Sequence, residues 1–262
     1  MKDLFSLEGK VSLVTGGNGG IGKGIADGLA MKGSSVVVAA RDVKKTAEAV
    51  EDIRARFGVK ASGVSLDVVN QASIKSAVKQ VLDQYGRIDV LVNNAGVNIR
   101  KMPQDYSPEE WDTVMDTNLK GAFQCCQAVY PAMKKQGKGK IINTGSMTSI
   151  FGLGKSVAYG CSKMGILSMT YSLALAWARD HIFVNCILPG WIDTALTVQA
   201  RKDFLGLSDF VEERTPLARW GQPEDFMGTA AFLASDASDF ITGESLRVDG
   251  GWAQHANTVS FK

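Results

Sequence analysis

The chain has 262 residues, of which 29 are Lys or Arg and 27 are Asp or Glu, so its formal net charge is +2 at pH 7. Both signs of charge are interleaved along the sequence, which argues against a nucleic-acid-binding protein because such proteins usually carry clustered basic residues. Hydrophobic residues make up 45% of the chain and only 6 residues are proline, which excludes a disordered or low-complexity protein. We expect residues 1–262 to form a single domain.

The cysteines and histidines give no indication of a metal site or of a disulfide framework. Cys125 and Cys126 are adjacent, Cys161 and Cys186 stand apart, and the chain has only 2 histidines. The N-terminal residues contain no continuous apolar stretch, and the most apolar segment, 166–178, is interrupted by serine and threonine. We therefore expect a cytoplasmic protein without a membrane span.

Seven short runs rich in β-branched residues recur along the chain, separated by longer stretches that contain amphipathic patterns. The runs are Val11–Thr15, Ser35–Ala40, Ala61–Leu66, Ile88–Asn93, Lys140–Thr144, Ile182–Leu188 and Ser245–Val248. Several read as apolar runs without alternation, which is typical of strands buried on both faces of a parallel sheet. The sequence therefore predicts a doubly wound α/β fold, with a parallel sheet of about seven strands and helices on both faces.

Two proline-containing segments predict helix starts. Ser107-Pro108-Glu109-Glu110 combines an N-cap serine, a first-turn proline and a glutamate three residues after the cap, so we expect a helix from there to about Lys135. A comparable start at residues 222–225 opens a late helix. The stretch before it, 190–221, has no clean periodicity, and we expect it to be a substrate lid.

The first strand runs into the glycine-rich segment TGGNGGIG at residues 15–22, which a helical pattern follows. A dinucleotide site needs this order of strand, tight turn and helix N-terminus, because the free N–H groups of the helix must face the phosphates. Two registers fit: one uses Gly17, Gly19 and Gly22, and the other uses Thr15, Gly16, Gly20 and Gly22. Taken alone, such a segment is also compatible with a loop that only joins a strand to a helix.

A phenol and an amine are spaced to share one helix face. Tyr159 and Lys163 are four residues apart in a long helical segment, so both side chains can meet the same ligand. A nearby lysine cation favours the phenolate, which makes the pair a candidate acid/base unit. Ser146 follows the strand that ends at Thr144, at the edge of the sheet where ligands of doubly wound folds bind. The alternative is a surface pair and a loop hydroxyl.

These motifs together resemble the short-chain dehydrogenase/reductase superfamily. The resemblance rests on Thr15-Gly16, Gly20-Ile21-Gly22, Asn93-Asn94-Ala95-Gly96, Asn118, Ser146, Tyr159, Lys163 and Pro189-Gly190, in this order. It covers essentially the whole chain, implies an NAD(P)-binding Rossmann domain and selects the second glycine register.

The resemblance also implies roles for individual residues. Tyr159 is the expected acid/base, Lys163 lowers its pKa and holds the nicotinamide ribose, Ser146 orients the substrate oxygen, and Asn118 locally breaks its helix and supports a proton relay. The implied cofactor contacts are Thr15, Gly16, Asn18, Gly20, Ile21, Gly22, Arg41, Asp67, Val68, Asn94, Gly96, Tyr159, Lys163, Pro189, Gly190, Ile192 and Thr194. The implied reaction is hydride transfer between a secondary alcohol and a nicotinamide, without a metal.

Residues at the end of the second strand bear on the choice of cofactor. Asp42 can accept hydrogen bonds from a free ribose hydroxyl, whereas Arg41 can bind a 2′-phosphate. In the family pattern the acidic residue that selects NAD aligns with the neutral Ala40, so NADP(H) is favoured and NAD(H) remains possible. Asn18 stands where many NADP enzymes have a basic residue, and Asp42 can instead cap the following helix.

The substrate is less well determined. The candidate substrate contacts are Asn98, Thr148, Leu153 and Trp191. Segments 5–10 and 97–100 resemble the gluconate 5-dehydrogenase branch, which implies a polyol, a sugar acid or a similar hydroxy compound. Alternatives are a reductase of 3-oxoacyl groups on a carrier protein, or of small ketones, and a catalytically silent nicotinamide-binding sensor. Lysines 134, 135, 138 and 140 are candidates for holding an acidic carrier protein.

The predicted helix at 157–180 has more apolar residues than one sheet face can cover, which indicates either an interface or a fully buried helix. These residues are Leu167, Met169, Leu173, Leu175 and Trp177. The resemblance implies a homotetramer built from such helices and from the last strand. The sequence assigns no role to the tail at 252–262.

Overall fold

The computed structural model describes residues 3–254 and contains, within them, one parallel sheet of seven strands in the order β3-β2-β1-β4-β5-β6-β7. The strands are β1 Val11–Thr15, β2 Ser35–Ala40, β3 Ala61–Ser65, β4 Val90–Asn93, β5 Gly139–Thr144, β6 Ile182–Pro189 and β7 Ser245–Val248. Every predicted run overlaps a strand, and the ends differ by at most two residues. The predicted doubly wound α/β fold is therefore confirmed, because the strand order reverses between β1 and β4.

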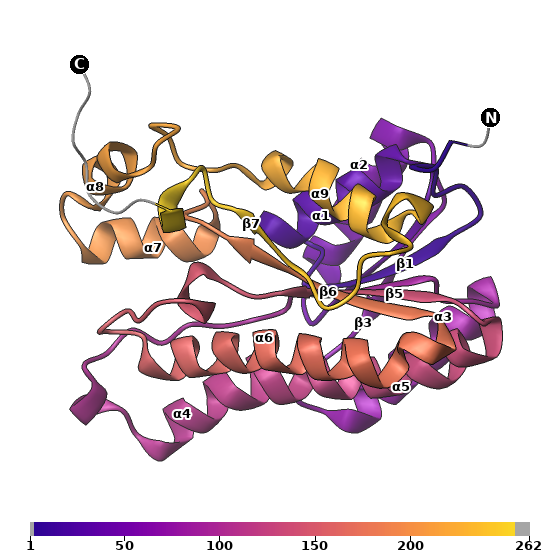
Figure 1. Cartoon of the computed structure of the whole chain (residues 1–262), viewed down its shortest axis with the longest axis horizontal. Helices are drawn as coiled ribbons and strands as arrows, with labels where there is room; N and C mark the ends of the chain where they lie inside the picture. The colour runs from indigo at the N-terminus through magenta and orange to yellow at the C-terminus, as the bar shows by residue number, and fades with distance from the viewer. Residues whose placement is uncertain (1–2, 255–262) are drawn as a thin grey trace.

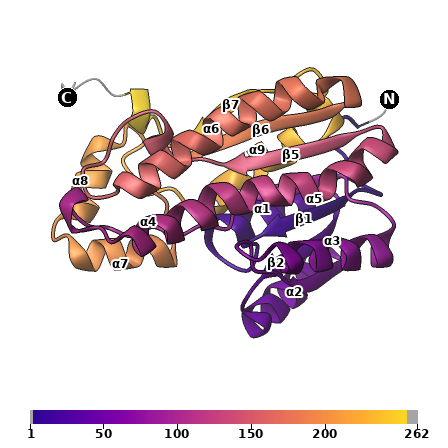
Figure 2. The same cartoon turned by 90° about the horizontal axis from the view of Figure 1, so that it is seen from below.

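Helices form a layer on each face of this sheet (Figure 1). One layer consists of α1 Gly20–Met31, α2 Val43–Phe57 and α9 Met227–Ala234. The other consists of α3 Gln71–Tyr85, α5 Gly121–Gln136 and α6 Val157–Trp177, with α4 Pro108–Met115 leading into α5. Figure 2 shows α5 and α6 running side by side, and both views place α7 Ala195–Asp203 and α8 Leu207–Arg214 beyond the end of the sheet. No helix within residues 3–254 is long and apolar enough to cross a membrane.

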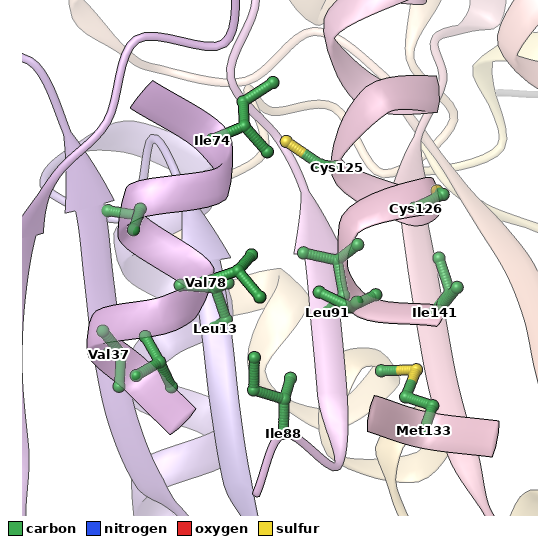
Figure 3. Packing of buried hydrophobic residues seen from close by; sticks show 14 of the residues in the cluster. Leu13, Val37, Ile74, Val78, Ile88, Leu91, Cys125, Cys126, Met133 and Ile141 are labelled. Atoms are coloured by element: carbon green, nitrogen blue, oxygen red, sulfur yellow. The ribbon is translucent and has the colours of Figure 1, made fainter. Parts of the chain in front are cut away.

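Each helical layer encloses its own apolar core. Figure 3 shows the core between the sheet and helices α3 and α5, where Ile74 of α3 points toward Cys125 of α5 and Val78 lies between Leu13 and Leu91 of the sheet. The second core lies under α1, α2 and α9 and includes Ile25, whose side chain has no exposed surface. Burying side chains of this size contributes about 1.5–3 kcal/mol each to stability. The two cores fix the helices on both faces and thereby the loops at the strand ends.

A close backbone contact joins α1 to the segment that leads into α9. A Cβ atom on Gly24 would lie 1.9 Å from the carbonyl oxygen of Pro223, and one on Gly28 would lie 2.4 Å from that of Met227. The late helix predicted from residue 222 begins with the 3-10 turn Pro223–Phe226 and continues as α9. These glycines let α9 and the turn before it pack closely against the middle and the second half of α1.

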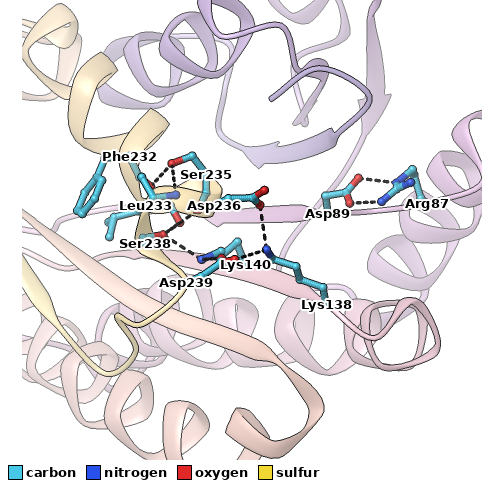
Figure 4. Close-up of polar contacts among 11 residues, drawn as sticks. Arg87, Asp89, Lys138, Lys140, Phe232, Leu233, Ser235, Asp236, Ser238 and Asp239 are labelled. Carbon is cyan, nitrogen blue, oxygen red and sulfur yellow. Dashed lines mark hydrogen bonds and ion pairs between the residues drawn. The ribbon is translucent and has the colours of Figure 1, made fainter. Parts of the chain in front are cut away.

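A polar cluster ties together the amino ends of the strands (Figure 4). The Lys140 side chain is 4% exposed, pairs with Asp239 at 2.9 Å and donates to the Ser238 hydroxyl at 2.9 Å. Lys138 pairs with Asp236 and with Asp239, at 2.9 and 2.5 Å. Both lysines therefore lie at the sheet edge opposite the carboxyl ends of the strands, where they are held by carboxylates.

Candidate active site

The carboxyl ends of four strands bring the predicted site residues to one edge of the sheet. Gly16 follows β1, Asn94 follows β4, Ser146 follows β5 and Gly190 follows β6. The boundary between β1 and β4 is the point where the strand order reverses, and ligands of such sheets bind in the crevice outside it. The backbone topology alone therefore forms a crevice for a ligand at the carboxyl ends of the strands.

The glycine-rich turn has the backbone geometry of the second register. Gly16 and Gly20 have φ of +66° and +52°, a region that glycine enters without strain, whereas Gly17 and Gly19 lie outside this left-handed region. A Cβ atom on Gly22 would lie 2.3 Å from the carbonyl oxygen of Gly16. No side chain caps the N-terminus of α1, so its N–H groups remain available to an anion.

Thr15 and Asn94 join this turn to β4. The Thr15 hydroxyl donates to the Val92 carbonyl at 3.2 Å and accepts from the N–H groups of Asn94 and Ala95, at 3.0 and 3.1 Å. The Asn94 amide donates to the carbonyl oxygens of Thr15 and Gly16, both at 3.3 Å. These bonds span the strand-order reversal and hold the floor of the crevice.

The residues predicted to contact the adenosine lie around β2 and β3. Arg41 is exposed, and the Asp42 side chain caps α2 by accepting from the Lys45 N–H at 3.0 Å. Asp67 and Val68 follow β3, and the Asp67 carboxylate accepts from the N–H of Val69 at 3.2 Å. Asp42 therefore has the capping role that the sequence left open.

The residues predicted to border the nicotinamide follow β6. Pro189 ends that strand, and the Gly190 N–H donates to the Val248 carbonyl at 2.9 Å. Ile192 forms a bridge with Gly221 and is 3% exposed. Thr194 caps α7 and lies against the glycine turn, 3.2 Å from the position of a Cβ on Gly20.

Asn118 lies in a π-helical turn, Asp116–Lys120, that interrupts the helix predicted from Ser107 to about Lys135. Its side chain accepts from the Val97 N–H at 2.8 Å and donates to the Val97 carbonyl at 2.9 Å. It also donates to the Ser162 hydroxyl at 3.0 Å. Asn118 is 1% exposed and links the loop after β4 to helix α6.

Tyr159 and Lys163 face each other on the first turns of α6. The Lys163 ammonium lies 5.6 Å from the centre of the Tyr159 ring and donates to the Thr144 carbonyl at 2.7 Å. Lys163 is 4% exposed, and burial lowers the pKa of its ammonium to about 8. The two side chains meet at the end of β5, as the spacing predicts.

The pKa of the Tyr159 phenol differs from the sequence prediction. Burial raises this pKa above its usual value, while a hydrogen bond with Ser146 and the positive charge of Arg100 lower it. The net shift is upward because desolvation of the phenolate is the largest effect. Lys163 is not among the groups that shift this pKa here, because its ammonium donates to the Thr144 carbonyl.

Ser146 begins a short turn that is hydrogen-bonded to α6. Its hydroxyl accepts from the Thr148 N–H at 3.1 Å, and its N–H donates to the Ser149 hydroxyl at 3.2 Å. The Ser149 hydroxyl in turn donates to the carbonyl of Lys163 at 2.7 Å. This chain of contacts fixes Ser146 beside Tyr159.

Two of the predicted substrate contacts have polar atoms without a partner. The Asn98 amide donates to the Ser156 hydroxyl at 3.5 Å, but its buried Oδ1 has no partner in the described residues. The Thr148 hydroxyl is likewise buried and unpartnered there, with the residue 7% exposed. An unpaired buried polar atom costs about 1–3 kcal/mol, so both atoms are suited to a polar ligand.

The other two predicted substrate contacts differ in burial. Leu153 is 42% exposed, whereas Trp191 packs edge-on against Trp220 and Trp252, at 5.8 and 6.1 Å between ring centres. Trp252 is 2% exposed and also contacts Phe210 of α8, at 5.7 Å. The described start of the tail therefore packs under the predicted lid, and its remainder lies outside the described residues.

Two charged residues near the site were not predicted from the sequence. Arg100 lies close enough to Tyr159 to lower its pKa and has no ion pair with any described residue. Lys45 approaches the glycine turn, with its ammonium 2.7 Å from the position of a Cβ on Gly19. The sequence signals are the place of Arg100 in segment 97–100, which resembles the gluconate 5-dehydrogenase branch, and the place of Lys45 in the first turn of the helix after β2.

A family model described as enoyl-(acyl carrier protein) reductase matches residues 16–253, which is most of the chain. The chain belongs to the short-chain dehydrogenase/reductase family. The seven-stranded sheet, the glycine turn and the Ser146, Tyr159 and Lys163 arrangement all agree with the motifs from which the resemblance was drawn. Since its relatives are named as dehydrogenases and reductases, the protein is an oxidoreductase of this family that acts on CH–OH groups.

Relatives from two branches of the family match the chain equally well. The 2-dehydro-3-deoxy-D-gluconate 5-dehydrogenase of Dickeya dadantii is 40% identical, over 95% of this chain and 98% of that protein. The 3-oxoacyl-[acyl-carrier-protein] reductase of Staphylococcus epidermidis is also 40% identical, over 92% and 98%. The structure of a gluconate 5-dehydrogenase from Burkholderia cenocepacia in complex with NADP and tartrate has a TM-score of 0.92 and 37% identity, covering 97% of this chain and 99% of that one.

Proposed function

We propose that this family member is an NADP(H)-dependent oxidoreductase that interconverts a secondary alcohol and a ketone on a sugar acid or a related polyol. The observation that carries the proposal is the meeting of Tyr159 and Lys163 at the end of β5, beside a glycine turn whose helix N–H groups are uncapped. NAD(H) is the alternative cofactor. The single Rossmann domain spans 1–262, with 190–221 as its lid.

In the proposed oxidation, the Tyr159 phenolate takes the proton of the substrate hydroxyl while a hydride leaves the carbon that bears this hydroxyl. The nicotinamide, when bound, accepts that hydride and returns it in the reduction. Ser146 donates a hydrogen bond to the substrate oxygen, and Lys163 holds the ribose and returns the phenol to its ionised form. Asn118 supports this set by fixing the loop after β4 against α6.

The residues around the turn fit a dinucleotide. The backbone of 15–22 leaves no room for a Cβ at Gly22, which is the close packing that a phosphate loop requires. We propose that Arg41 lies at the adenosine, with Asp67 and Val68, and that Pro189, Gly190, Ile192 and Thr194 lie at the nicotinamide.

A charged substrate is supported by Arg100. This half-buried guanidinium acts on the pKa of Tyr159 and has no ion pair within the described residues. Arginine binds carboxylates through paired hydrogen bonds, so it is suited to the acid group of a sugar acid. Asn98 and Thr148 offer unpartnered polar atoms to its hydroxyl groups.

The decisive experiment is an absorbance assay of the nicotinamide with gluconate, neutral sugar alcohols and simple secondary alcohols, together with the matching ketones. We expect turnover with sugar acids or polyols, and a loss of at least about 100-fold in kcat in Tyr159→Phe, because the phenylalanine ring cannot transfer a proton. The same variant should bind the cofactor with unchanged affinity in a fluorescence titration. Full turnover in Tyr159→Phe would exclude the proposed chemistry.

Arg100→Met tests the substrate class. We expect it to raise KM for a sugar acid by about 10-fold or more, because the charge-assisted hydrogen bonds to the carboxylate are lost. KM for a neutral polyol of equal length should change little. Lys101→Met is the matched control, since the Lys101 ammonium pairs with Glu110 at 2.5 Å. An equal change for acid and polyol would contradict a carboxylate contact.

Two alternatives have distinct outcomes in the same assay. Turnover confined to 3-oxoacyl thioesters or small ketones would assign the reductase branch. Against it, Lys138 and Lys140 pair with carboxylates at the far edge of the sheet, and Lys134 pairs with Asp180 at 3.3 Å. Cofactor binding without any turnover would favour a sensor.

We also propose a cytoplasmic homotetramer. Exposed apolar residues gather where α5 and α6 run side by side: Phe123, Met164, Tyr171 and Leu175 are 39%, 53%, 43% and 83% exposed. Of the residues that the sequence singled out, Leu167 and Leu173 belong to the core and Trp177 stacks on Tyr130 at 4.7 Å. Of the five apolar residues that the sequence analysis named on this helix, only Leu175 is strongly exposed. The proposed interface therefore rests on the four exposed residues of α5 and α6 together.

A further inference from the structure

We propose that Lys45 binds the 2′-phosphate of NADP(H) and replaces the basic residue that the glycine turn lacks at Asn18. This inference rests on the proposed use of a nicotinamide dinucleotide. It adds a specificity-determining residue that neither the spacing of motifs nor the resemblance assigns.

The position of the ammonium is the first argument. Lys45 projects from the first turn of α2 across to the glycine turn, where its Nζ and Cε lie 2.7 and 3.1 Å from the place of a Cβ on Gly19. The ammonium thus occupies the space beside Gly19 in which a side chain at that position would begin. Lys45 therefore brings a positive charge to the turn from a different element of the fold.

The approach of α2 to the turn is itself fixed by hydrogen bonds. The Asn18 amide donates to the Thr46 hydroxyl at 3.3 Å, and that hydroxyl donates to the Asp42 carbonyl at 2.6 Å. The Asp42 carboxylate accepts from the Lys45 N–H at 3.0 Å, which secures the first turn of the helix. Asn18 thus acts as a contact to α2, and the cation is supplied by the residue next to Thr46.

The Lys45 ammonium forms no ion pair or hydrogen bond with a described residue. By contrast, Lys23 on the neighbouring helix pairs with Asp27 and Asp52, at 2.6 and 2.5 Å. Arg41 is likewise exposed and has no ion pair there. Two free cations therefore flank the end of β2, the place at which this fold distinguishes a ribose hydroxyl from a phosphate.

A phosphate on the ribose would gain a charge-assisted hydrogen bond that a hydroxyl cannot match. The Asp42 carboxylate, which could accept from a free hydroxyl, is oriented toward α2 by the hydrogen bond from the Lys45 N–H to its Oδ1. We expect both effects to favour NADP(H) over NAD(H). The pyrophosphate is common to both cofactors, so a contact with it would not discriminate between them.

The test is a binding titration of the full-length protein with Lys45→Gln, monitored by the fluorescence of NADPH and, separately, of NADH. We expect the Kd for NADPH to rise about 10-fold or more and the Kd for NADH to change less than about 2-fold. Lys44→Gln is the matched control, because this neighbouring exposed lysine makes no approach to Gly19. The rise in the Kd for NADPH in Arg41→Gln, compared with that in Lys45→Gln, measures how much each of the two residues contributes to binding the phosphate.

A second readout separates the phosphate from the rest of the cofactor. Adenosine 2′,5′-bisphosphate should lose affinity in Lys45→Gln, while adenosine 5′-monophosphate should not. Equal losses for NADPH and NADH would assign Lys45 to the pyrophosphate and overturn the proposal, as would an unchanged Kd for NADPH. Neither titration uses a substrate, so a failure here is distinguishable from a failure of the proposed oxidoreduction. An unchanged melting temperature excludes a folding defect.

Discussion

Lys163 carries a buried positive charge that the fold accommodates at a cost in stability. Lowering the pKa of its ammonium from 10.5 to about 8 corresponds to about 3 kcal/mol. Its hydrogen bond to the Thr144 carbonyl offsets only part of this cost. In the proposed reaction this ammonium acts next to the phenol and the ribose, so we infer that stability is lost at Lys163 for the sake of the site.

Lys163→Met is expected to raise the free energy of unfolding at pH 7 by about 1–2 kcal/mol while abolishing turnover, because it removes the buried charge. The folded pKa lies below the unfolded one, so the unfolded state binds more protons between about pH 8 and 10.5. The stability of the wild type should therefore rise toward that of the variant across this window. Urea unfolding of both proteins at pH 7 and pH 10 measures the difference.

Lys120→Met provides the control for this comparison, because the Lys120 side chain is 63% exposed. It should change the stability little at either pH. A Lys163→Met protein that is less stable at pH 7, or a difference that stays constant with pH, would show that the buried charge carries no net cost.

At single residues the sequence predicted which side chains meet at the candidate site, but not which charges surround them. Tyr159 and Lys163 could be paired from their spacing alone, because one helix places both. Arg100 and Lys45 reach the site by long side chains from a loop and from a different helix. Their positions depend on how elements pack, and one sequence does not contain that information in a local pattern.

Among the elements, strands were more predictable than the helix that carries Asn118. A strand buried on both faces leaves a continuous apolar run, such as VSLVT at β1. The π-helical turn at 116–120 leaves no such pattern, since its helical periodicity is close to that of α4 and α5. Only the resemblance indicated a break there.

The contact between α1 and α9 gives a stability test at the level of elements. Gly28→Ala would place a methyl group 2.4 Å from the Met227 carbonyl, so α9 must move away. We expect the free energy of unfolding to fall by about 1–3 kcal/mol. We also expect weaker cofactor binding, since a displacement at Gly28 would shift α1, which begins in the glycine turn. Thermal unfolding and an NADPH titration provide the two measurements.

Gly228→Ala is the matched control in the facing helix. No atom lies within 4 Å of a Cβ at Gly228, which is exposed on α9. This variant should be more stable by about 0.5–1 kcal/mol because alanine favours a helix. If Gly28→Ala were as stable as Gly228→Ala, the two helices would not be in the close contact described.

In the whole molecule, the two ends of the parallel strands differ in what they hold. The amino edge is held by ion pairs around Lys138 and Asp239, and the carboxyl edge holds the candidate site. The face formed by α5 and α6 belongs to neither end, yet it exposes apolar side chains along its length. Met164, Tyr171 and Leu175 follow helical spacing, so they form one stripe on α6.

The stripe on α6 predicts the behaviour of the molecule in solution. Analytical ultracentrifugation should give the mass of four chains for the wild type and a smaller species for Tyr171→Asp with Leu175→Asp, because two carboxylates would have to be buried at the interface. Val43→Asp is the control, since Val43 is 67% exposed on α2, away from this face. A monomeric wild type would contradict the tetramer, and a tetramer that survives the double substitution would place the interface elsewhere.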